Sequence, residues 1–329
     1  KKILEDISAQ FLSGKVNQII GQSGSGKTVL MKSIIGLFRP EEGQVLYDGR
    51  NLVDMSGREV KRLRQEVGML FQGSALFDSL TVLGNVMFPL EMFAKMTRKE
   101  MEERAKFCLT RVNLMPDKFG LYPGEISGGM QKRVAIARAI ALNPKYLFCD
   151  EPNSGLDPVT SLVIDKLIEE ITEEYNITTI VNTHDMNSIM ETGAHIILIE
   201  KGHKAWEGSK DDIFTSDNKS LNDFVFASDL FKNERKVYLD RMEELVAQER
   251  TSQEQLLESH EQQMTLLGKK QIQLQQQMEE NQKALMKCVT RMGMVIIVLL
   301  CICIMLLIPW GSSPIWPILG LVVLITLGV

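Results

Sequence analysis

The eight residues from Gly21 to Thr28 constrain this chain more than any other part of its sequence. They satisfy the pattern G-x-x-x-x-G-K-[ST], and they are Gly21, Gln22, Ser23, Gly24, Ser25, Gly26, Lys27 and Thr28. The glycines let the backbone curl until its N–H groups point at phosphates, and the start of a following helix adds its positive dipole end. We expect Lys27 to reach the β- and γ-phosphates of a nucleotide and the Thr28 hydroxyl to ligate Mg²⁺.

The flanking segments suit such a loop, since an apolar stretch ends at Ile20 and a helical pattern runs over residues 28–37. Asn17 and Gln18 do not fit this picture. They are polar at positions of the leading strand that a parallel sheet should bury on both faces.

Residues 1–232 alternate short apolar runs with amphipathic stretches, which is typical of an α/β domain. The predicted strands are residues 15–20, 67–71, 146–149, 178–182 and 196–200, and Lys1 begins a further apparent strand. The predicted helices include residues 28–37, 100–112, 130–141 and 160–175. Strands that alternate with helices form βαβ units, so we expect a mostly parallel sheet.

Polar residues follow three of these strands. Asp150 ends an apolar strand and is expected to hold Mg²⁺, while Glu151 would lie beside the γ-phosphate and polarise the attacking water. His184 and Gln72 also follow strands, at the rim where α/β sheets bind ligands. Each of these two residues is unremarkable when taken alone.

The overall composition narrows the classes of partner. A formal charge of -5 and a pI of about 5.6 argue against a non-specific nucleic-acid binder, which normally shows a basic stripe. The five cysteines form no CxxC pair, so we interpret them as reduced thiols of a cytosolic chain. The sequence starts without Met, so we expect it to be cut at its start.

The run at residues 126–133 is the most specific feature after the phosphate loop. It contains Ser127, Gly128 and Gly129 and resembles the signature of ABC ATPases, about 20 residues before the acidic strand. In the same way, residues 71–73 resemble the Q-loop of this family, residues 154–158 the D-loop, and His184 the switch histidine.

This resemblance covers residues 1–232 and implies a RecA-like P-loop NTPase core with a helical signature subdomain at about residues 74–135. It implies that Glu151, His184 and Gln72 are catalytic, and that Gln72 joins Thr28 and Asp150 at the Mg²⁺. It also implies that two subunits pair head to tail around two ATP molecules, so that Ser127, Gly128 and Gly129 of one chain face the nucleotide of the other. We expect a homodimer, because both Glu151 and the signature are present.

A narrower resemblance lies at residues 73–90 and at Met130, which are similar to the ATPases of Mla-type phospholipid transporters. That similarity implies a membrane permease and an MCE-domain protein as partners, at the cytoplasmic face of the inner membrane. Residues 75–90 are the candidate surface for the permease, although Leu76 and Phe77 fit a local core equally well. The aromatic residue that stacks on adenine in the family is expected before Lys1.

Residues 233–291 differ from the rest, because Gln, Glu and Lys dominate and Gly and Pro almost disappear. Alternate steps of three and four from Leu257 to Cys288 select ten positions, of which seven are apolar. This spacing predicts a long helix, either solvated or in a coiled coil. Whether residues 234–329 belong natively to the ATPase stays open.

Residues 292–329 contain no charge. Residues 292–308 form a 17-residue apolar run, long enough for a minimal membrane span, and residues 315–329 suggest a truncated span or the return arm of a hairpin. Lys283, Lys287 and Arg291 precede the run, which favours a cytoplasmic ATPase side.

Three alternatives remain beside lipid transport. One is an importer ATPase for a small solute, and another is an ABC ATPase that acts on ribosomes or DNA. In the third, the tail is the functional part, as a membrane-anchored coiled-coil scaffold. The single ATPase domain and the C-terminal position of the long helix disfavour the second, and the transported substrate cannot be deduced from this sequence.

Overall fold

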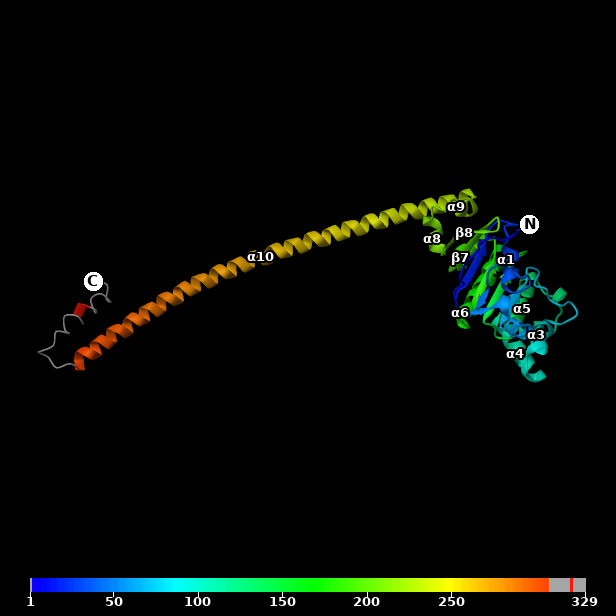
Figure 1. The fold of residues 1–329 in the computed structure, drawn as a ribbon, viewed down its shortest axis with the longest axis horizontal. Helices are drawn as coiled ribbons and strands as arrows, with labels where there is room; N and C mark the ends of the chain where they lie inside the picture. The colour runs from blue at the N-terminus through cyan, green and yellow to red at the C-terminus, as the bar shows by residue number, and fades with distance from the viewer. Residues whose placement is uncertain (1, 308–319, 322–329) are drawn as a thin grey trace. The chain divides into compact units, whose positions relative to one another are not determined.

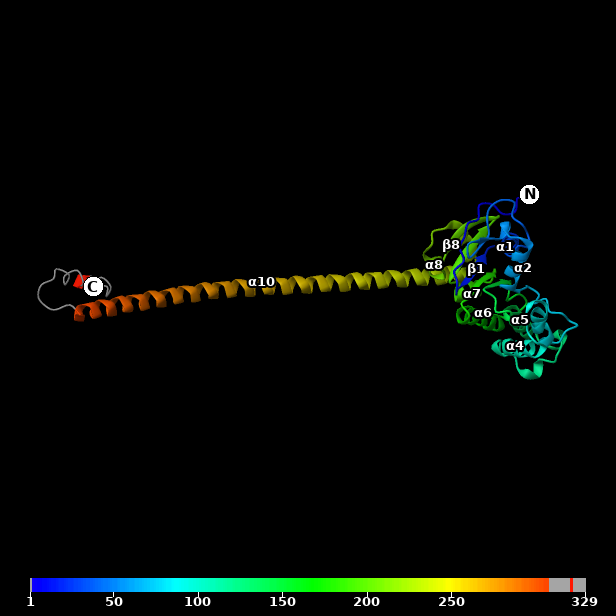
Figure 2. The same ribbon diagram turned by 60° about the horizontal axis from the view of Figure 1, so that its bottom comes forward.

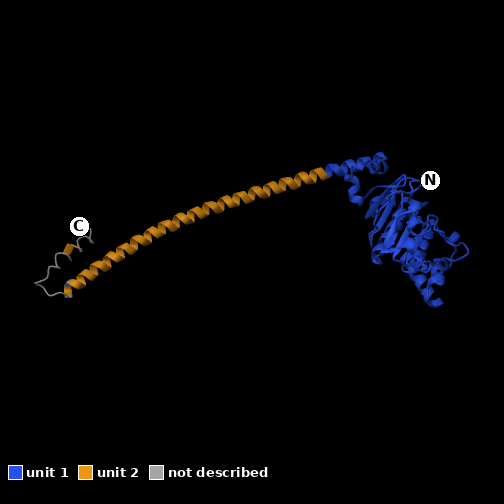
Figure 3. Cartoon of the chain, viewed as in Figure 1, with its two compact units in different colours: residues 1–241 blue, residues 242–329 orange. Residues whose placement is uncertain are grey.

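The computed structural model describes residues 2–307 and 320–321. It divides into two compact units, residues 1–241 and residues 242–329, which are coloured separately in Figure 3. The first unit contains the sheet and its covering helices. The second contains most of one long helix.

A six-stranded sheet forms the centre of the first unit (Figure 1). In the order β4-β5-β6-β1-β7-β8, its strands are β4 (Val67–Leu70), β5 (Tyr146–Asp150), β6 (Thr178–Asn182), β1 (Val16–Ile20), β7 (His195–Glu200) and β8 (His203–Gly208). The first five are parallel to their neighbours, and β8 is antiparallel to β7. The predicted α/β class is confirmed, and the five parallel strands lie within a residue of their predicted bounds.

Helices lie on both sides of this sheet (Figure 2). Their bounds are α1 (Lys27–Ile34), α2 (Gly57–Gln65), α3 (Val82–Phe93), α4 (Arg98–Arg111), α5 (Gly128–Ile140), α6 (Pro158–Glu174), α7 (Met186–Thr192), α8 (Lys210–Thr215) and α9 (Lys219–Val225). A small hairpin of β2 (Leu46–Tyr47) and β3 (Arg50–Asn51) precedes α2. Helices α3, α4 and α5 pack on one another and make up the helical region after β4.

Side-chain caps explain where several helices begin. Thr81 accepts a hydrogen bond from the Gly84 N–H at the start of α3, and Thr97 forms a capping box with Glu100 at the start of α4. Such caps satisfy N–H groups that have no partner inside the helix and typically stabilise it by about 1 kcal/mol.

The core occupies both faces of the sheet. Ile19 belongs to an apolar cluster with Met31 and Phe148, whereas its neighbour Ile20 belongs to a cluster with Ile189 and Leu198. Successive residues of a strand point to opposite faces, so both faces of β1 are covered.

The polar side chains of β1 are buried but hydrogen-bonded. The Asn17 amide donates to the carbonyl oxygens of Leu12, Lys15 and Thr179, each at 3.0 Å. The Gln18 amide donates to the Ser188 carbonyl at 3.0 Å and to the Thr192 hydroxyl at 3.1 Å. Asn17 therefore bonds the preceding loop and Gln18 links β1 to α7, although the Gln18 Oε1 has no partner among the described residues.

The predicted strand at the start of the chain is wrong. Residues 2–15 form neither strand nor helix. Glu5 donates its N–H to the Gly202 carbonyl at 2.9 Å, and Lys204 bonds the Ser8 carbonyl. This segment lies along the β7–β8 turn through isolated bonds and not through a ladder.

The long helix predicted after the sheet is confirmed as α10 (Asp229–Leu307), with 79 residues, or about 120 Å at 1.5 Å per residue. Its first turns belong to the first unit. Arg235 donates to the Phe214 and Ser216 carbonyls, and Tyr238 stacks on Phe214 with ring centroids 4.9 Å apart. A truncation at residue 232, where the predicted ATPase domain ends, would remove this packing, so one that spares it belongs after Arg241.

Helix α10 is also the one helix of the described residues that is long and apolar enough to cross a membrane, by length and composition alone. The predicted break at residues 309–314 lies outside the described residues, as does all of the predicted run at residues 315–329 except residues 320–321.

Candidate active site

The predicted site residues follow the carboxyl ends of four neighbouring strands. In sheet order, Gln72 follows β4, Asp150 ends β5, His184 follows β6, and the loop at residues 21–26 follows β1. Because the four strands are parallel and adjacent, these ends meet at one edge of the sheet.

The phosphate loop requires glycine for a steric reason at its first position. Gly21 has a φ of 144°, and a Cβ built there would lie 2.2 Å from the Ile199 carbonyl oxygen. The loop then turns through a bond from the Ser25 N–H to the Gln22 carbonyl at 3.1 Å and enters α1 directly after Gly26. The unpaired N–H groups of the first turn of α1 are thus placed at the end of the loop.

Lys27 lies folded against this loop. Its Nζ donates to the Gly21 carbonyl at 2.7 Å and to the Gln22 carbonyl at 3.1 Å, and the side chain is buried. Burial lowers the pKa of Lys27, while the negative charges of Glu151 and Asp150 act to raise it. The ammonium therefore lies within electrostatic reach of both acids.

The residues present fit a nucleotide with Mg²⁺. The Ser25 hydroxyl is buried in the loop without a hydrogen-bond partner among the described residues, so it is available to a phosphate oxygen. Thr28 is exposed on the first turn of α1, and Asp150 supplies a carboxylate. The described residues hold no cluster of three His, Cys, Asp or Glu side chains, but Mg²⁺ at phosphates needs few protein ligands.

Asn182 at the end of β6 positions the two acids, a role that the sequence did not reveal. Its side-chain amide donates to the Asp150 carboxylate at 3.1 Å, and its carbonyl accepts from the Glu151 N–H at 3.0 Å. Glu151 has a φ of 50°, in the left-handed region, where a residue other than glycine costs about 1–3 kcal/mol. Such backbone strain is typical of a side chain aimed for function.

His184 contacts the Glu151 carboxylate, with its Nδ1 2.9 Å from Oε1 and 2.8 Å from Oε2. The imidazole is 66% exposed and Glu151 only 16% exposed, so the histidine covers the acid from the solvent side. The structure therefore brings together two residues that lie 33 positions apart in the chain.

The Q-loop is held by two basic residues of α5 that sequence reasoning missed. Lys132, 4% exposed, bonds the Gln72 carbonyl, and burial lowers its pKa. Arg138 donates to the Ser74 and Ala75 carbonyls, both at 2.6 Å, where both residues have positive φ. The Gln72 side chain itself donates to the Ser154 hydroxyl at 3.4 Å. Through Lys132 and Arg138, the Q-loop is linked to the signature helix α5.

The signature residues lie at the start of α5. Ser127 caps the helix by accepting from the Met130 N–H at 3.3 Å. A Cβ on Gly129 would lie 2.8 Å from the Thr160 Cγ2, so glycine permits the close approach of α5 to α6. A cavity of about 540 Å³ opens in front of Ser127, and its lining includes Lys118 and Arg133 but no residue of the phosphate loop. Within one chain, this cavity and the phosphate loop are separate features.

A buried polar chain connects the segment between Glu151 and the D-loop to α7. Asp165 of α6 accepts from the Asn153 amide at 2.8 Å and from the Ser188 hydroxyl at 2.9 Å. Burial raises the pKa of Asp165 to about 6, and the two hydrogen bonds oppose that shift. Asp165 thus joins the segment after Glu151 to the helix after His184.

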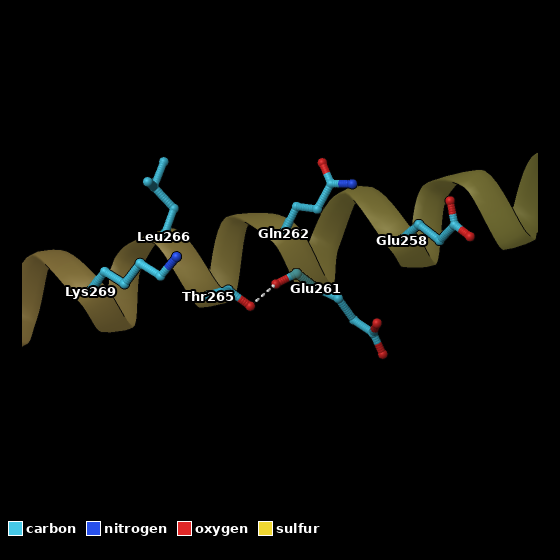
Figure 4. Close-up of a pocket in the computed structure, with 6 residues that line it drawn as sticks. All are labelled: Glu258, Glu261, Gln262, Thr265, Leu266 and Lys269. Carbon is cyan, nitrogen blue, oxygen red and sulfur yellow. Dashed lines mark hydrogen bonds between the residues drawn. The ribbon is translucent and has the colours of Figure 1, made fainter.

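A depression on α10 lies outside this edge of the sheet. Figure 4 shows its six lining residues, Glu258, Glu261, Gln262, Thr265, Leu266 and Lys269, all on one helix. The bond between them runs from the Thr265 hydroxyl to the Glu261 carbonyl at 2.8 Å. All six are exposed, so the depression is a groove between neighbouring side chains and not an enclosed ligand site.

Comparison with known proteins gives one consistent family. The sequence profile described as "ABC transporter" matches residues 4–154. The methionine import ATP-binding protein MetN of Carboxydothermus hydrogenoformans is 43% identical over 213 residues, which are 65% of this chain and 63% of MetN. The "Probable ribonucleotide transport ATP-binding protein mkl" of Mycobacterium leprae is 37% identical over 224 residues, which are 68% of this chain and 64% of that protein. The chain thus spans less than two thirds of the length of either relative.

Solved structures agree. The ATP-binding cassette MJ0796, in a dimeric post-hydrolysis state with ADP and Pi, matches with a TM-score of 0.58 and 34% identity over 63% of this chain and 90% of its own. The cbiO1 protein of Clostridium perfringens, part of the cbiONQ transporter complex, matches with a TM-score of 0.61 and 29% identity over 67% of this chain and 88% of its own.

Proposed function

We propose that this chain is an ATP-binding protein of the ABC transporter family that hydrolyses ATP to energise a membrane transporter. The observation that carries the proposal is the pairing of Glu151 with His184 next to Asp150, on the same sheet edge as the phosphate loop.

In the proposed reaction, the N–H groups of the loop and Lys27 hold the β- and γ-phosphates. Glu151 polarises a water molecule whose oxygen bonds to the γ-phosphorus while the bond to the β–γ bridging oxygen breaks, giving ADP and phosphate. His184 keeps the Glu151 carboxylate in place. When bound, Mg²⁺ would neutralise phosphate charge, and Thr28, Asp150 and Gln72 would hold it.

The second half of each site is proposed to come from a second copy. Ser127, Gly128 and Gly129 present the N-terminus of α5, where unpaired N–H groups favour a phosphate. The cavity in front of them lacks a phosphate loop in its own chain, which a head-to-tail dimer would supply.

Mixing two inactive variants tests this shared site. Lys27→Ala disables the loop and Ser127→Arg blocks the signature, so each variant alone should lose phosphate release. In a mixed dimer, one of the two sites combines an intact loop with an intact signature, so random pairing should restore about a quarter of the activity. Normal hydrolysis by Ser127→Arg alone would refute the shared site.

For the transported substrate, we propose phospholipid, with a permease and an MCE-domain protein as partners at the cytoplasmic face of the inner membrane. Support comes from the Mla-like segment at residues 73–90. Its buried Asn85 donates to the Phe77, Leu80 and Thr81 carbonyls, which presents Phe77 at the surface against Phe88. Phe77 is 42% exposed, whereas Leu76 packs on the core, so Phe77 is the residue suited to contact a permease.

Import of a small solute is the second candidate, because MetN is named for methionine import. Phospholipid that co-purifies with the complex of this chain and its permease would favour lipid transport. Strict dependence of ATP hydrolysis on a soluble binding protein would favour import instead.

Residues 292–308 are proposed to anchor the chain in the same membrane, with Arg291 on the cytoplasmic side. Deletion of residues 292–329 should then move the protein from the membrane fraction to the soluble fraction when no permease is co-expressed. Retention of the deleted chain on membranes would argue against the anchor.

A further inference from the structure

Helix α10 carries a largely apolar seam that no other described residue covers. Steps of three and four from Leu257 to Cys288 select positions that all lie exposed. The large apolar ones are 60–69% exposed, and they are Leu257, Met264, Leu267, Leu274, Met278 and Leu285. The seam continues without a change of step to Met292, Val295, Leu299 and Ile302, all exposed as well.

The spacing of this seam points to a partner helix. From Leu257 to Cys288 it repeats every seven residues over more than four heptads, beyond the three or four that favour a coiled coil. A straight helix has 3.6 residues per turn, so a strict seven-residue seam drifts about 20° per heptad unless two helices wind around each other.

We propose that α10 pairs with α10 of a second copy of this chain, parallel and in register, from Leu257 onward. The proposal goes beyond ATP hydrolysis, because it assigns a permanent dimer contact outside the ATPase unit. A parallel pair has a two-fold axis, the symmetry expected of a homodimer, so the same two copies can share both contacts.

Polar residues on the seam favour a copy of the same helix as the partner. His260, Gln271 and Asn281 interrupt the apolar positions. In register, each would face its own counterpart, and the Gln and Asn side chains could hydrogen-bond across the pair. A shifted register would place these groups against Leu or Met, which leaves buried polar groups unpaired.

The apolar stretch after Arg291 favours the parallel direction. In a parallel pair both stretches lie at the same end, where both can enter one membrane. An antiparallel pair would place them at opposite ends of the coil.

The same seven-residue register also predicts where the pair begins. Before Leu257 it meets Gln253, Arg250, Val246, Glu243, Leu239 and Lys236, so every second position is charged. In a parallel dimer each of these charges would face an identical charge, which is unfavourable. The helices should therefore separate before Leu257, and the coil would keep the two ATPase units near each other when hydrolysis opens them.

Disulfide cross-linking of the full chain in detergent tests the proposal. In the proposed pair, Cys288 of one copy faces Cys288 of the other, within the Cα separation of about 4.4–6.8 Å that a disulfide requires. Mild oxidation should give a covalent dimer that Cys288→Ser abolishes. In a background with Cys288, Cys301 and Cys303 changed to Ser, Asn281→Cys on the seam should restore the dimer, and Lys283→Cys on the opposite face should not.

The cross-linked fraction at residue 281 should exceed that at residue 283 at least about tenfold, because only the seam position meets the distance requirement. Equal cross-linking at both positions, or none at residues 281 and 288, would overturn the proposal. Adding Lys27→Ala to the cross-linking variants distinguishes pairing through α10 from ATP-driven closure of the ATPase units. An unchanged dimer supports the coil, and loss of the dimer would show that the ATPase units alone bring the helices together.

Discussion

Helices α6 and α10 show similar apolar periodicity, but the apolar face is buried in α6 and exposed in α10. In α6, Ile164, Ile168 and Ile171 are buried against the sheet and α5. In α10, Leu267, Leu274 and Leu285 are at least 60% exposed. The pattern of apolar residues therefore identifies the helix and its buried face, while the partner of that face has to come from elsewhere in the chain or from another molecule.

Polar side chains are likewise buried and paired in the first unit but exposed on α10. Asn17, Gln18 and Asp165 are buried, and each has hydrogen-bond partners within the first unit. Gln271 and Asn281 lie exposed on α10. We therefore expect the ATPase unit to fold alone and α10 to need a second copy, and the following changes test that difference.

The largest effect is expected in the ATPase unit from Glu151→Gln. It removes the carboxylate that is proposed to polarise water but keeps the shape of the side chain, so hydrolysis should fall about 10²–10⁴-fold. ATP binding should persist, because Lys27 and the loop are untouched. Phosphate release and nucleotide binding measure the two effects, and turnover at the native rate would contradict the role of Glu151.

Lys27→Ala should lower hydrolysis at least about a hundredfold, because the phosphates lose a preorganised positive group. The change also removes two hydrogen bonds to the loop, so circular dichroism of the variant serves as the folding control. In contrast to Glu151→Gln, nucleotide binding should weaken too.

Charges on the seam should break α10 pairing without harming the ATPase unit. Leu274→Glu with Met278→Glu should abolish the Cys288 cross-link, because four like charges would face one another in the coil. The matched control is Gln262→Glu with Gln276→Glu on the opposite face, which adds the same charge and should leave the cross-link intact. Equal loss of the cross-link in both variants would mean that added charge, and not its position on the seam, prevents pairing.

The smallest effect is a pH dependence from Asp165 in the first unit. Its folded pKa of about 6 lies above its unfolded value, so folding favours the protonated form. Asp165 should therefore lower the free energy of unfolding as pH rises from about 4 to about 6, by about 2–3 kcal/mol in total. Denaturant unfolding of residues 1–241 with and without Asp165→Asn should show this difference, and parallel pH profiles would contradict it.

Much of the fold was predictable, since the parallel strands and the long helix carry strong periodic patterns. The edge that gathers Gln72, Asp150 and His184 was predictable as well, because residues after parallel strands meet there. Lys132, Arg138 and Asn182 were not, because their role depends on contacts with carbonyls and carboxylates far along the chain. Asp165 was missed for the same reason, since a lone acid in a helix gives no sign of burial.

The most direct test of the central claim uses residues 1–241 with Glu151→Gln, without the coil. Sedimentation should show a monomer without nucleotide and a dimer with ATP and Mg²⁺, and adding Ser127→Arg should abolish the ATP-dependent dimer. A fragment that stays monomeric with bound ATP, or a dimer indifferent to nucleotide and to Ser127→Arg, would contradict a nucleotide site shared between two chains.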